Sequence, residues 1–112
     1  MYFKKDNIVK LKETKVIMTA DFPKERIHVF IYGNVQGITF RYFLKRNADD
    51  LELTGWVKNK DNNCVEAVFE GKRARITRIR KFCKLGPNLA RIKEVKVIKE
   101  ELENIERFSI IR

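Results

Sequence analysis

Apolar residues along the chain alternate between strand spacing and helix spacing. The segment from Arg26 to Tyr32 is apolar or amphipathic on both faces, which is typical of a central strand. Apolar positions at helical spacing predict helices over 38–51 and over 72–85, the second ended by Gly86-Pro87. Further strands are predicted over 53–58, 65–69, 92–98 and 107–111.

This order of strands and helices predicts an α+β fold. We expect a ferredoxin-like split-βαβ sandwich, in which a βαββαβ unit plus a C-terminal strand forms an antiparallel sheet with two helices on one face. A strand–helix–strand crossover returns the chain in its original direction. The ends of the first and second strands should therefore lie at one edge of the sheet.

The first 25 residues differ from the rest of the chain. Their apolar residues follow no clear period, and Pro23 separates them from the first strand. We expect residues 1–25 to be an extension and residues 26–112 to be the folded domain. The sequence leaves open whether the extension is disordered or covers the second face of the sheet.

Composition narrows the classes of function. The 112 residues suit one domain, and no apolar run is long enough to cross a bilayer, so we expect a cytoplasmic protein without membrane contact. A single histidine, His28, and two cysteines, Cys64 and Cys83, form no metal-ligand spacing, so no zinc or iron site is expected. We predict packing roles for all three, because nothing near His28 in sequence would orient it as a base.

Basic residues dominate the second predicted helix. The net charge is +10, and seven basic residues and no acidic one lie between Lys72 and Lys84. This cluster is either a footprint for nucleic acid or a solvated helix face, and we favour the face.

The joint between the first strand and the first helix has candidate chemistry. Its sequence from Gly33 to Arg41 is Gly-Asn-Val-Gln-Gly-Ile-Thr-Phe-Arg. We expect the two glycines to allow a tight bend in which backbone N–H groups converge on an anion. These N–H groups belong to Asn34, Val35, Gln36, Gly37, Ile38 and Thr39, and Arg41 would add a bidentate cation. Glycines at such joints are also common for steric reasons alone, and the spacing fits neither a nucleoside triphosphatase nor a dinucleotide fingerprint.

Asn59 follows the second predicted strand. By itself this asparagine would be interpreted as a turn residue. The crossover, however, brings the end of its strand to the edge that carries the glycine-containing loop, which makes Asn59 a candidate for the same site.

Together these residues resemble the acylphosphatase family. The resemblance covers about residues 26–112 and rests on several motifs in the family's order: Gly33, Val35, Gln36, Gly37, Ile38, Phe40 and Arg41; Gly55, Trp56, Val57 and Asn59; Val65 and Glu66; Gly86, Pro87 and Ala90; Phe108 and Ile110. The sequence departs from the pattern in three places. Glu52 stands where the family usually has glycine, Asn62-Asn63 replaces Asp-Gly, and Asn34 occupies a position that is often basic.

The resemblance implies a metal-independent, cofactor-free acylphosphatase, a hydrolase that converts acyl phosphates to a carboxylate and inorganic phosphate. It implies that Arg41 and the loop amides hold the phosphate while Asn59 orients the attacking water. We expect a monomer whose partner is a small-molecule acyl phosphate. Two alternatives remain: a basic ferredoxin-like nucleic-acid-binding module, which the third predicted strand does not favour because it lacks the aromatic run of such modules, and a non-catalytic carbamoyl-phosphate-binding relative.

Overall fold

The computed structural model describes residues 23–61, 63–87 and 91–112. Two helices and five strands occur in these ranges: β2 (Lys24–Asn34), α1 (Ile38–Asp50), β3 (Thr54–Lys60), β4 (Cys64–Lys72), α2 (Arg73–Leu85), β5 (Arg91–Glu100) and β6 (Phe108–Ile110). The predicted elements are confirmed, with boundaries that shift by only a few residues. No helix in the described ranges has the length and apolarity needed to span a membrane. The predicted extension lies almost wholly outside these ranges, although β2 begins inside it.

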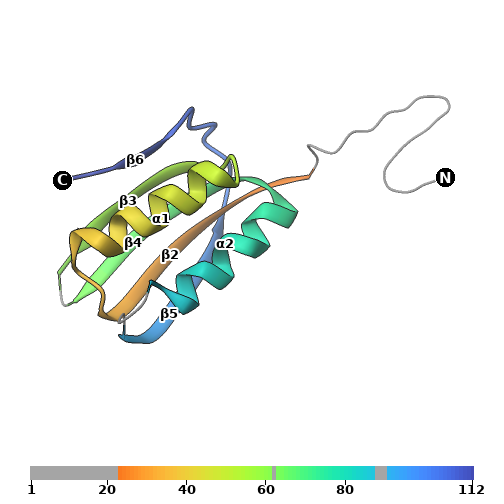
Figure 1. The fold of residues 1–112 in the computed structure, drawn as a ribbon. Helices are drawn as coiled ribbons and strands as arrows, with labels where there is room; N and C mark the ends of the chain where they lie inside the picture. Colours follow the sequence, from red (N-terminus) through yellow and green to blue (C-terminus); the bar gives the residue numbers. More distant parts are fainter. Residues whose placement is uncertain (1–22, 62, 88–90) are drawn as a thin grey trace, which may run out of the picture.

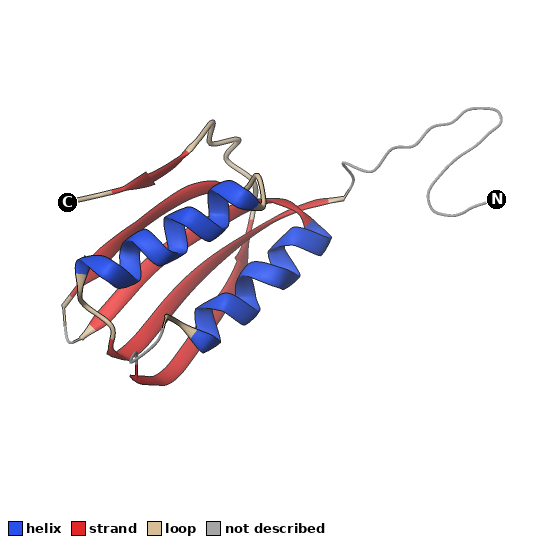
Figure 2. Ribbon diagram, viewed as in Figure 1, coloured by secondary structure: helices blue, strands red, loops and turns tan. Residues whose placement is uncertain are grey.

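The five strands form one sheet in the order β5-β2-β4-β3-β6. β4 runs antiparallel to both β2 and β3, so these two strands point the same way on either side of it, which is the split-βαβ arrangement. Both helices cover the same face of the sheet (Figures 1 and 2). The predicted fold class is therefore confirmed.

One strand pair departs from the predicted antiparallel sheet. β6 pairs in parallel with β3, with Gly55 opposite Phe108. The reason is that β5 and β6 lie at opposite edges of the sheet, so residues 101–107 carry the chain across it before β6 begins. This crossing returns β6 to the direction of β3, which also brings the C-terminal residues to the end of β3.

The core lies between the helices and the sheet. Apolar stripes on α1 and α2 pack against side chains from the inner face of the strands: Ile27, Val29, Ile31, Phe40, Leu44, Val57, Phe69, Ile76, Ile79 and Cys83 are among the residues that share this core. Burial raises the pKa of the Cys83 thiol to about 12. Cys64 is buried as well, so the predicted packing roles of both cysteines are confirmed.

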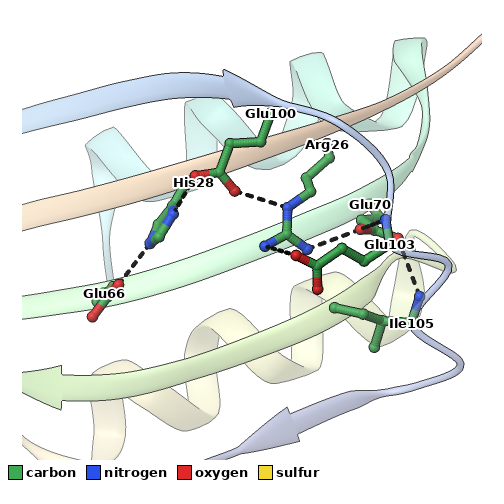
Figure 3. A network of polar contacts seen from close by, with 7 residues as sticks. All are labelled: Arg26, His28, Glu66, Glu70, Glu100, Glu103 and Ile105. Atoms are coloured by element: carbon green, nitrogen blue, oxygen red, sulfur yellow. Dashed lines mark hydrogen bonds and ion pairs between the residues drawn. The ribbon is translucent and has the colours of Figure 1, made fainter.

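The opposite face of the sheet carries a network of charged side chains around Arg26 (Figure 3). Arg26 is 5% exposed and lies 2.9 Å from Glu70 and 2.8 Å from Glu100. His28 lies between two carboxylates, with Nε2 2.6 Å from Glu66 and Nδ1 2.7 Å from Glu100. His28 is packed, as predicted, and no residue near it in sequence orients it, but two carboxylates do. Its partners come from neighbouring strands, far away in sequence.

Candidate active site

The joint between β2 and α1 bends at Gly33. This glycine has φ 141°, and a Cβ added to it would lie 2.1 Å from the carbonyl oxygen of Arg91 on β5. Gly37, in contrast, has an ordinary extended backbone with φ −103°, and a Cβ there would meet nothing within 4 Å. The prediction that both glycines allow the bend is therefore right for Gly33 and wrong for Gly37. The space beside Gly37 is open instead.

Backbone donors are left free between this bend and the helix. Five consecutive N–H groups have no hydrogen-bond acceptor within the described ranges, and they belong to Val35, Gln36, Gly37, Ile38 and Thr39. The hydrogen bond that follows them runs from Phe40 N to Gly37 O at 3.2 Å. No side chain of a described residue caps this end of α1. Unpaired donors at a helix N-terminus favour an anion. Asn34, in contrast, lies inside β2 opposite Arg91.

Arg41 and Asn59 lie at one hollow in the surface. It measures about 430 Å³ and is lined by Arg41, Lys58, Asn59, Ile111 and Arg112. Arg41 projects from the first turn of α1 and is half-buried, and its Nε is buried without a hydrogen-bond partner among the residues that the structure describes. A buried donor without an acceptor is uncommon in folded proteins, so Arg41 lacks its usual partner at this atom. The part of Arg41 that can meet a ligand is the part that lines the hollow.

Asn59 reaches the hollow from within a strand. The prediction placed it just after the second strand, but it is part of β3, paired opposite Val65 of β4. The hairpin ladder continues to the pair Lys60 and Cys64, and this pairing extends the strand past the end of its apolar pattern. Asn59 is nevertheless exposed, and it lies at the end of the sheet where β2 leads into the loop, as the crossover argument predicted.

Sequence analysis missed three residues that line the hollow. Lys58 precedes Asn59 in the chain. Ile111 and Arg112 lie beside β3, where Ile111 N donates to Val57 O at 2.8 Å. The parallel pairing of β6 with β3 brings the last two together with Asn59, and no local motif signals it. With Arg41, the lining holds three cationic side chains and no acidic one, which favours a negatively charged ligand.

Thiolate chemistry and a metal cluster find little support among the residues that the structure describes. Burial raises the pKa of the Cys64 thiol, which disfavours a thiolate there. Within the described ranges no group of three His, Cys, Asp or Glu side chains could hold a metal ion. The arrangement can therefore bind an anion and place a neutral carboxamide beside it.

The fold and the hollow define a class: an α+β sandwich with free N–H groups at a strand–loop–helix joint and a carboxamide at the same end of the sheet. The acylphosphatase family model matches residues 27–110. An acylphosphatase from Trichormus variabilis is 44% identical over 87 residues, covering 78% of this chain and 86% of that protein. An acylphosphatase structure from Coxiella burnetii has a TM-score of 0.77 at 34% identity, covering 84% of this chain and all of that one. The chain belongs to the acylphosphatase family, and the predicted family and hydrolase class are confirmed.

The domain also resembles part of a much larger protein. Full-length HypF, in a phosphate- and nucleotide-bound crystal form, has a TM-score of 0.74 at 28% identity. The match covers 80% of this chain and 12% of HypF. The alternatives to hydrolysis are not better supported, because the acylphosphatases match over most of their own length.

Proposed function

We propose that this protein hydrolyses acyl phosphates to a carboxylate and inorganic phosphate. In this proposal Arg41 and the free loop amides from Val35 to Thr39 hold the phosphoryl group, and Asn59 orients the attacking water. Asn34, which was also predicted to contribute its N–H, belongs to β2 and is left out. One observation carries the proposal. Among the described residues, five N–H groups without an acceptor lie in the loop just before Arg41, and Arg41 and Asn59 line the same hollow.

The chemistry matches what these groups can supply. The water oxygen would form a bond to phosphorus while the bond from phosphorus to the acyl oxygen breaks and the carboxylate leaves with the electron pair. The water's surplus proton would pass to solvent or to a phosphate oxygen. Because the carboxylate is a good leaving group, the protein need mainly place one water in line and stabilise charge on the phosphoryl oxygens. Neither a strong base nor a metal ion is needed in this scheme.

Substitution of the two side chains tests the proposal. We expect Arg41→Ala and Asn59→Ala each to lower kcat/KM for acetyl phosphate or benzoyl phosphate by at least ~10²-fold, the scale of losing one preorganised donor. Arg41→Lys should fail similarly, because a compact ammonium cannot make the two parallel hydrogen bonds of a guanidinium. Phosphate release is the measurement, and it should be insensitive to chelator.

Matched controls come from the same chain. Arg80→Ala removes an exposed arginine from α2. Asn47→Ala removes a carboxamide whose one hydrogen bond within the described residues lies inside α1, to Phe43 O at 2.8 Å. Both should retain near-normal turnover. Near-normal turnover by Arg41→Ala or Asn59→Ala would contradict the assigned roles.

We further propose that the enzyme works as a cytoplasmic monomer on a small-molecule substrate. The nucleic-acid alternative predicts a different result, namely salt-sensitive binding of an oligonucleotide without turnover of acyl phosphates. Size-exclusion chromatography with light scattering tests the oligomeric state, and an oligonucleotide titration at two salt concentrations tests nucleic-acid binding.

A further inference from the structure

The side chain of Gln36 fastens the loop to the β3–β4 hairpin. Its Nε2 donates to Cys64 O at 2.8 Å and also to Lys60 O. These two acceptors are not independent, because Lys60 and Cys64 face each other as a pair of the β3–β4 ladder. One carboxamide nitrogen therefore spans both strands of the hairpin where they meet the turn.

A second bond joins the same two segments. Gly33 N donates to Asn63 O at 3.2 Å, so the loop is attached to the hairpin through its start as well as through Gln36. Of these two attachments, the one through Gln36 belongs to a residue whose own backbone N–H is free, whereas Gly33 precedes the free N–H groups. On the hairpin side, that attachment reaches the residue directly after Asn59.

The chemistry of the contact suits a neutral amide. A carboxamide nitrogen has two hydrogens, and here it has two carbonyl acceptors. A glutamate at this position would offer no donor and would place a negative charge beside two carbonyl oxygens. A methionine would keep the length of the side chain and lose both hydrogen bonds.

We infer that the Gln36 side chain is a positioning residue, which sets the distance between the phosphate-binding amides and Asn59. It acts through Asn59 and does not itself touch the reacting atoms. The inference rests on the proposed function, and it assigns to the Gln36 side chain a role separate from that of its own backbone N–H. Placement errors of this kind reduce turnover steeply, because the reacting atoms must be aligned before they react.

A double-mutant cycle tests the inference. We expect Gln36→Met to lower kcat by about tenfold or more. Competitive inhibition by inorganic phosphate, which reports the amide cradle and Arg41, should change by less than about twofold because Gln36→Met leaves the backbone N–H groups in place. In an Asn59→Ala background Gln36→Met should cost less than about twofold in kcat, because two residues that act as a unit are not additive. Asn47→Ala is the control, and it should leave kcat unchanged in both backgrounds.

Amide hydrogen exchange gives a readout that does not depend on activity. In Gln36→Met the Gly33 N–H, which is bonded to Asn63 O, should exchange about tenfold faster, because the loop opens more easily from the hairpin. Asn47→Ala should not change it.

Three results would overturn the inference: equal losses of kcat in both backgrounds, weaker phosphate inhibition with normal kcat, or unchanged exchange at Gly33. Failure of the proposed function looks different. In that case wild-type protein would release no phosphate from acyl phosphates, while the exchange at Gly33 would still decide whether Gln36 fastens the loop.

Discussion

The two glycines of the loop serve different purposes, and alanine substitution should separate them. In Gly33→Ala the new Cβ would lie 2.1 Å from Arg91 O at φ 141°, so we expect a loss of about 1–3 kcal/mol in the free energy of unfolding. In Gly37→Ala the backbone is unstrained and the space is open, so stability should change by less than about 0.5 kcal/mol. Urea unfolding measures both effects.

Activity should follow the opposite order from stability. The methyl group of Gly37→Ala enters the open space beside the free N–H groups, where the proposed phosphoryl group would lie, and kcat/KM should fall by about tenfold or more. Folded Gly33→Ala should lose less kcat/KM than Gly37→Ala does. A Gly37→Ala variant with full activity would show that the ligand does not approach the loop at this point.

At the scale of elements, the junction between α1 and β3 holds a residue in an unfavourable conformation. Glu52 has φ 56°, a left-handed value, at the position where the family pattern usually has glycine. We expect Glu52→Gly to be more stable than Glu52→Ala by about 1 kcal/mol, since only glycine adopts this φ without strain. Both variants lose the ion pair with Arg75, so the difference between their free energies of unfolding reports the effect of the backbone conformation at residue 52. Equal midpoints of urea unfolding would mean that the junction relaxes when the side chain is removed.

The elements could be predicted from sequence better than the contacts between them. Apolar period and the Gly86-Pro87 stop fixed the helices closely, because helix spacing is a local property. The crossover argument also predicted correctly that Asn59 lies at the end of the sheet next to the loop. The parallel pairing of β6, the hydrogen bonds of Gln36 and the carboxylates around His28 could not be predicted this way, since each depends on strand register across the sheet. The family motif named Gln36 but did not indicate what its side chain contacts.

At the scale of the whole molecule, the outer-face network should make stability fall in acid. Burial alone would raise the pKa of Glu70, but hydrogen bonds from Glu103 N, Arg26 and Ile105 N outweigh it and lower that pKa. The pKa of Glu100 is lowered chiefly by its hydrogen bond with Arg26.

A carboxyl whose pKa is lower in the folded state gives its full stabilisation above the unfolded-state pKa of about 4.3 and loses it as the pH falls through the folded value. The free energy of unfolding in urea should therefore be nearly flat above about pH 5.5 and fall steadily below it. Glu100→Gln removes one of these carboxyls, so its free energy of unfolding should fall less steeply between pH 5 and pH 3 than that of wild type. Glu101→Gln is the matched control, because Glu101 is exposed and forms no ion pair within the described ranges. If Glu100→Gln and Glu101→Gln showed the same pH dependence, the pairing of Glu100 with Arg26 would contribute nothing to acid stability.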